Sequence, residues 1–268
     1  LMLGAVGSAY ALIFSNIVAF LLTFVAIIIE FCKKHIVPTI NYSLLKRILA
    51  LALPIAILNV VATISFMSLT RFATIFAGGS VAILSAHLLA IRYNSMVVLP
   101  SRSLASGVTA VTARNLGDRD RLQDIAKYGL IYGVVFGGIM AVVTLLFSKQ
   151  LIAIFGGHEV DSLIGATYLK ILSIDCLVVP IVVVLFALVD GAHHTTSTMI
   201  ISLLSSISRP ITAYVAGAVL GLNIYGVAIA VPTASLISLA IIVPILLFIK
   251  IKDSKKKIAE NSVSAIQT

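Results

Sequence analysis

The sequence predicts an all-α protein that crosses a membrane seven times. Of the 268 residues, 60% are hydrophobic and only 11% are charged, whereas soluble domains carry about 25% charged residues. The mean hydropathy is +1.15. The apolar residues also gather into seven windows that are each long enough to span, because a membrane helix needs about 20 mostly apolar residues.

These windows are separated by charged and turn-forming residues. In chain order they cover residues 7–31, 45–75, 80–112, 125–147, 163–189, 198–220 and 226–249. Lys33 and Lys34 close the first window, and Lys46 and Arg47 open the second. A hydrophilic loop follows the third window at residues 113–124, and a lysine run at 255–257 follows the last.

The distribution of basic residues predicts the orientation of the chain. The segments around 33–47, 113–124 and 252–268 hold most of the lysines and arginines. All three lie on one side of the membrane if every window spans, and loops rich in lysine and arginine face the cytoplasm. We therefore expect a cytoplasmic carboxyl terminus in the cell (inner) membrane. The net charge of +9 is then explained by basic residues in the cytoplasmic segments. We expect a lipid bilayer and no nucleic acid as partner.

Two windows carry polar stripes and a third carries a glycine stripe. Ser80, His87, Asn94 and Ser101 recur every seven residues, so they share one helix face, which predicts a polar, hydrated interior. Thr198, Ser202, Ser205, Arg209 and Thr212 form a second such face. Gly129, Gly133 and Gly137 repeat every four residues and predict a close approach of another helix.

An internal repeat relates the first window to the last. Residues 7–11 and 226–230 both begin with glycine, both follow a short turn rich in leucine and glycine, and both open a hydrophobic helix that ends in lysines. Doubled helical units are common in transporters. We therefore expect a six-helix lobe preceded by the last helix of another lobe, with the natural protein starting upstream of Leu1.

Several motifs resemble the multidrug and toxic compound extrusion (MATE) family. They are the Leu-Ala-Leu-Pro sequence at 51–54, Gly78-Gly79, the segment 113–118, the segment 168–172 and the glycine-led polar turn at 191–195. The resemblance implies twelve helices in two lobes around a central cavity with alternating access. On that basis, residues 1–31 are the last helix of the first lobe. Residues 32–47 are a cytoplasmic linker, 48–252 the second lobe and 253–268 a cytoplasmic basic tail.

The resemblance implies a secondary efflux transporter that exports small organic, often cationic, compounds in exchange for sodium or protons. Some branches carry an acidic residue about two turns after the proline that opens the lobe, where this chain has Asn59. A flippase for lipid-linked precursors and a seven-helix receptor are alternatives. No clustered metal ligands and no nucleophile or phosphate-loop motifs are present, so we expect no enzyme activity and no cofactor beyond the coupling ion.

Polar residues within spans are the candidate site residues, because a charge at the bilayer centre costs several kcal/mol. The candidates for the substrate or ion pathway are Asn59, His87, Arg92, Asn94, Arg102, Asp175, Ser205 and Arg209. His87 is also a candidate proton carrier, since the ordinary pKa of histidine is about 6.5. Asp175 and Arg209 each lie near the middle of adjoining windows, at similar depth, and we expect them to form an ion pair.

Overall fold

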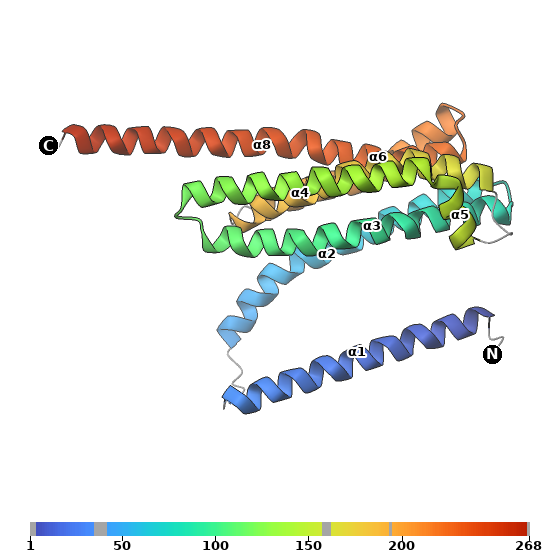
Figure 1. The fold of residues 1–268 in the computed structure, drawn as a ribbon, viewed down its shortest axis with the longest axis horizontal. Coiled ribbons are helices and arrows are strands. Elements are labelled where there is room, and N and C mark those ends of the chain that lie inside the picture. The colour runs from blue at the N-terminus through green and yellow to red at the C-terminus, as the bar shows by residue number, and fades with distance from the viewer. Residues whose placement is uncertain (1–3, 35–41, 157–161, 193–194, 267–268) are drawn as a thin grey trace. The chain divides into compact units, whose positions relative to one another are not determined.

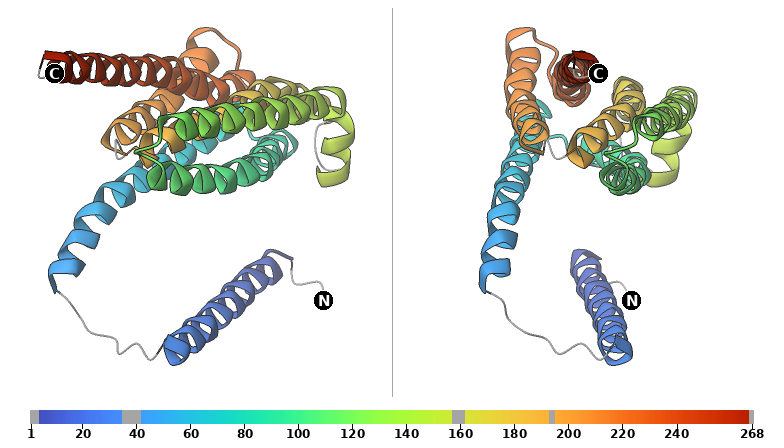
Figure 2. Two further views of the ribbon diagram at one scale, coloured as in Figure 1. Left: turned by 60° about the vertical axis from the view of Figure 1, so that its left-hand side comes forward. Right: turned by 90° about the vertical axis from the view of Figure 1, so that its left-hand side faces the viewer.

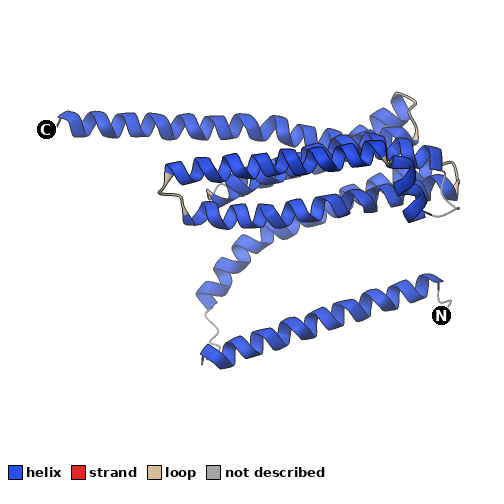
Figure 3. Ribbon diagram, viewed as in Figure 1, coloured by secondary structure: helices blue, strands red, loops and turns tan. Residues whose placement is uncertain are grey.

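The computed structural model describes residues 4–34, 42–156, 162–192 and 195–266, and this part of the chain is helical with short turns and no strand (Figure 3). The helices are α1 (Gly4–Lys34), α2 (Tyr42–Phe76), α3 (Val81–Arg114), α4 (Arg119–Leu146), α5 (Ser148–Gly156), α6 (Ser162–Gly191), α7 (Thr195–Tyr214) and α8 (Ile224–Ile266), with a π-helical turn, η2 (Val215–Val219), after α7. In the described part, seven helices are long and apolar enough to span a membrane. The predicted fold class and all seven windows are confirmed.

The chain separates into two compact units, residues 1–52 and residues 53–268. The first unit contains α1, whose apolar side chains are exposed along its length, as with Phe14 and Phe20. Residues 35–41 of the predicted linker lie outside the described residues. The functional division into lobes stays a prediction.

Helix α6 is the centre of the second unit. It packs against α3, α4, α5, α7 and α8, and α3 and α4 run alongside it in the views of Figures 1 and 2. Tyr168, Leu169, Leu172 and Cys176 of α6 are fully buried. A helix that is hydrophobic around its whole circumference belongs inside a bundle, which is where the structure places α6.

The glycine stripe of α4 permits its close contact with α6. A Cβ atom on Gly137 would lie 2.8 Å from the carbonyl oxygen of Leu177, and one on Gly133 would lie 3.1 Å from that of Pro180. On Gly129 it would lie 3.0 Å from Cγ1 of Val184. The predicted close helix approach is confirmed, and α6 is the helix that approaches.

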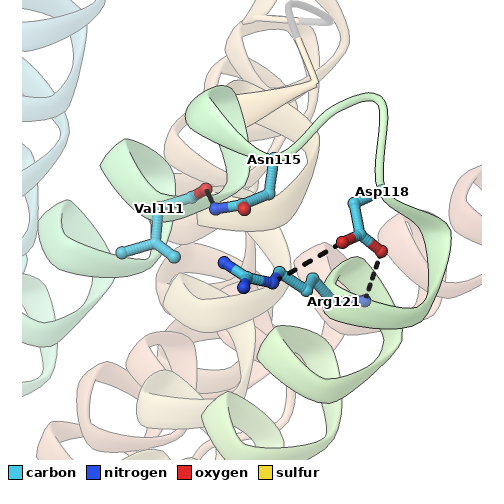
Figure 4. A network of polar contacts seen from close by, with 4 residues as sticks. All are labelled: Val111, Asn115, Asp118 and Arg121. Carbon is cyan, nitrogen blue, oxygen red and sulfur yellow. Dashed lines mark hydrogen bonds and ion pairs between the residues drawn. The ribbon is translucent and has the colours of Figure 1, made fainter.

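The turn between α3 and α4 is tighter than the sequence predicts (Figure 4). Asp118 caps α4, because its Oδ1 accepts a hydrogen bond from the backbone N–H of Arg121 at 3.1 Å. Its Oδ2 lies 3.5 Å from Nε of the same arginine. Asn115 closes α3 by donating from Nδ2 to the carbonyl oxygen of Val111 at 2.8 Å. Helix α4 therefore begins at Arg119, six residues before the predicted apolar window.

The sequence prediction missed α5. Ser148 and Lys149 follow the fourth predicted window, and they open a nine-residue helix that lies between the fourth and fifth windows. This segment is far shorter than a membrane span, so a search for long apolar windows cannot detect it. Ile152 anchors α5, since its side chain is buried against the position of Gly165 on α6.

Candidate functional site

A cavity of about 560 Å³ lies within the second unit, among five helices. Its walls come from α2, α3, α6, α7 and α8. The lining residues are Leu58, Asn59, Ala62, Phe66, Ile91, Asn94, Ser95, Val98, Leu99, Arg102, Asp175, Val179, Val182, Val183, Phe186, Ser202, Ser205, Ser206, Arg209, Val231, Ser235 and Ser238. Apolar walls with a few converging polar groups are typical of small-molecule sites.

The structure brings six of the eight sequence-predicted site residues to this cavity. They are Asn59, Asn94, Arg102, Asp175, Ser205 and Arg209. His87 and Arg92 do not line it. The structure shows that the six residues line the cavity, whereas the functional role of each of the eight candidates stays a prediction.

Asp175 is held by neighbouring helices on two sides. Its Oδ2 accepts a hydrogen bond from Nδ2 of Asn94 on α3 at 2.7 Å. Its Oδ1 accepts one from Oγ of Ser235 on α8 at 2.5 Å. The Asp175 residue is only 2% exposed, so these neutral donors offset much of the cost of burying its carboxylate.

Arg209 is not the ion-pair partner of Asp175, and that sequence prediction is wrong. Within the described residues, neither of these two side chains takes part in an ion pair, although both line the cavity. The guanidinium of Arg209 instead lies over the ring of Phe66, 4.6 Å from its centroid. Its Nε is buried without a hydrogen-bond partner. Similar depth in adjoining helices therefore brought the two groups to one cavity without bringing them into contact.

Of the four residues in the α3 stripe, Asn94 lines the cavity and the other three do not. Ser80 is the N-cap of α3, where its side chain accepts a hydrogen bond from Ile83 N–H. His87 is 1% exposed, and its Nδ1 lies 2.6 Å from the hydroxyl of Tyr168 on α6. Ser101 is 1% exposed too. A seven-residue spacing identifies one helix face but does not distinguish a neighbouring helix from water.

The sixth-window stripe is divided between the cavity and the helix ends. Ser202, Ser205 and Arg209 line the cavity. Thr198 donates to Oδ1 of Asp190 where α6 and α7 meet. Thr212 bonds back to the carbonyl oxygen of Ser208 at 2.8 Å, a common local bond for threonine in membrane helices.

Sequence reasoning did not select Phe66, Ser95, Ser235 or Ser238 as site residues, although all four line the cavity. Ser235 and Ser238 lie three residues apart on α8, so they share a face, and that spacing was the available signal. Phe66 gave no such sequence signal, because a single phenylalanine in an apolar helix does not differ from its neighbours. Its importance comes from the arginine that it faces.

The polar contacts continue from Asp175 away from the cavity. The thiol of Cys176 lies 3.7 Å from Oδ1 of Asn94 and 3.8 Å from the hydroxyl of Thr144. That threonine is 2.9 Å from the hydroxyl of Tyr93. Within the described residues, no cluster of three or more histidine, cysteine, aspartate or glutamate side chains could hold a metal ion.

A sequence model of the MatE family matches residues 54–215, which is more than half of the chain. The chain belongs to the MatE family. This MATE chain is 25% identical over 166 residues to the "Probable multidrug resistance protein YoeA" of Bacillus subtilis (strain 168), covering 57% of this chain and 34% of that protein. The chain thus spans about a third of the length of this curated relative.

Two solved structures share the fold of this MATE chain. They are titled as the inward-facing and the outward-facing conformation of a multidrug resistance MATE family transporter of the MOP superfamily. Each has a TM-score of 0.68 and 19% identity. The alignments cover 82% and 81% of this chain, and 50% and 49% of the solved chains. The fold, the family and the apolar helices make the protein an integral membrane protein.

Proposed function

We propose that the protein is a secondary transporter that moves small organic compounds out of the cell by alternating access. The observation that carries the proposal is the cavity, where polar groups from five helices converge inside an otherwise apolar bundle. Polar groups at membrane depth are expensive, so their concentration in one cavity supports a solute pathway. Family membership supports the same function.

Alternating access is supported by the matched folds. This chain resembles an inward-facing and an outward-facing structure equally well by TM-score, so this half of the fold is compatible with both states. Such a change is expected when one lobe moves largely as a rigid body. Coupling to a sodium or proton gradient belongs to the proposal.

The proposal includes a topology. With the positive-inside rule, the turn between α3 and α4 and the end of α8 face the cytoplasm. The match to the MatE family weighs against the two alternatives, a flippase for lipid-linked precursors and a seven-helix receptor.

Transport by proteoliposomes tests this function. The protein, expressed from its own reading frame, is reconstituted in vesicles loaded with a cationic dye (ethidium) or an anionic dye (carboxyfluorescein). A sodium or a pH gradient is then imposed, and an ionophore that dissipates the gradient is the control. We expect gradient-dependent movement of at least one dye. If neither dye moves under either gradient while the protein is folded and inserted, the proposed function is wrong.

A further inference from the structure

Among the described residues that line the cavity, two arginines and one carboxylate are the charged groups, so their formal charges sum to +1. Arg102 on α3 is exposed and Arg209 on α7 is half-buried, and both line the cavity. Asp175 is the carboxylate among the described lining residues, and it is buried with each oxygen already accepting a hydrogen bond. A cation in the cavity would meet two guanidinium groups, and the carboxylate that lines the same cavity is already satisfied by neutral donors.

Arg209 has an unmet hydrogen-bonding requirement. Its Nε is buried and has no acceptor, which is costly for a charged donor. The ring of Phe66 lies under the guanidinium, and stacking of this kind attracts the cation while leaving its edge N–H groups free. Because Arg209 lines the cavity, an acceptor that binds there would lie beside a guanidinium whose Nε the described protein groups leave unpaired.

The chemistry of the two arginines selects the ligand class. Guanidinium groups recognise carboxylate, sulfonate and phosphate oxygens with paired hydrogen bonds. The walls beside them are apolar and include Val98, Leu99 and Phe186, which suit the hydrocarbon part of a ligand. Two positive side chains at one cavity repel each other in a low-dielectric environment, and a bound anion relieves that repulsion.

We propose that this cavity binds small amphipathic organic anions, with Arg102 and Arg209 holding the anionic group. The proposal rests on the proposed transport function and names the substrate class of the same cavity. It replaces the cationic substrates that the family resemblance implied.

Direct binding to the protein in nanodiscs of neutral phosphatidylcholine tests the site, since these discs contain no anionic lipid that could occupy it. Fluorescence anisotropy follows carboxyfluorescein, with naphthalene-2-sulfonate as anionic competitor and tetraphenylphosphonium as cationic competitor. Arg102→Gln and Arg209→Gln should each weaken binding about tenfold, the loss expected for one charge-assisted contact. Arg114→Gln is the matched control, because Arg114 is an exposed arginine of the same helix as Arg102 and lies outside the cavity.

Arg209→Lys is the control for a loss of binding that is caused by misfolding rather than by the loss of the guanidinium. It keeps the positive charge but lacks the planar fork, so binding should fall between that of the wild type and Arg209→Gln. We expect naphthalene-2-sulfonate to displace the dye and tetraphenylphosphonium to leave it bound. The anion site is wrong if Arg102→Gln and Arg114→Gln bind the dye equally well, or if the cation is the better competitor.

The two proposals fail in different ways. Gradient-driven movement of ethidium without binding of carboxyfluorescein would overturn the anion site and leave the transport function standing. Binding of carboxyfluorescein that depends on Arg102, without gradient-driven movement of either dye, would overturn the transport function and leave the site standing.

Discussion

Replacing Gly137 by alanine tests the close contact between α4 and α6. The added Cβ would lie 2.8 Å from the carbonyl oxygen of Leu177 and 3.2 Å from that of Cys176. Both are backbone atoms of a buried helix, so the helices must separate to make room. Overpacking of this kind costs about 1–3 kcal/mol, while alanine gains up to about 1 kcal/mol over glycine in a helix.

Gly138 provides the matched control one residue along the same helix. A Cβ there has no atom within 4 Å, so Gly138→Ala should keep only the gain in helix propensity. The two variants should differ by about 1–3 kcal/mol in the free energy of unfolding. For a protein of this size, that corresponds to about 2–10 °C in the unfolding midpoint.

The chain has no tryptophan, so unfolding is best followed with a thiol-reactive coumarin dye. Cys176 is fully buried and becomes reactive only when α6 is exposed. The measurement uses a Cys32→Ser background, because the second thiol lies on α1 in the other compact unit. Equal midpoints for Gly137→Ala and Gly138→Ala would refute the close contact.

Three further predictions concern topology, the cavity and its carboxylate. A cysteine at Asp118 should react with an impermeant thiol reagent only after cells are permeabilised, and labelling from outside would reverse the proposed orientation. A cysteine at Ser95, which is exposed at the cavity, should react faster with a small polar reagent than one at Ser101, which is 1% exposed; equal rates would contradict the cavity geometry. Asp175→Leu should destabilise the protein by about 1–3 kcal/mol, because it leaves the buried hydroxyl of Ser235 without its acceptor. Asp175→Asn should cost less because an amide keeps an acceptor oxygen, and thermal unfolding that ranks the two variants in the opposite order would disprove this role.

The spans and their order could be predicted because each span is one continuous apolar run of the sequence. A long apolar run has few stable alternatives to a membrane helix, and the four-residue glycine spacing marks a packing face without further information. The short helix α5 has neither signal. Its formation depends on the contact of Ile152 with α6, and a contact between distant segments is not visible in local sequence.

The sequence predicted which site residues lie near the middle of their helices, but it did not predict which residues they contact. The sequence places Asp175 and Arg209 near the middle of their helices, and the structure has both at one cavity. Which neighbour each contacts depends on the rotation of the helices about their axes, which packing decides. Asn94 and Ser235 therefore hold the carboxylate, and Phe66 lies under the guanidinium.

The two hydrogen-bond partners of Asp175 are also synthesised at different times, one before the carboxylate and one after it. Asn94 precedes the carboxylate by 81 residues and is already in the bilayer when α6 leaves the translocon. Ser235 follows by 60 residues, so its hydroxyl is added later, when α8 arrives. We expect the amide of Asn94 to be the first of the two partners available to the carboxylate during that interval. Two contacts that look equivalent in the finished protein thus have unequal importance while the chain is being made.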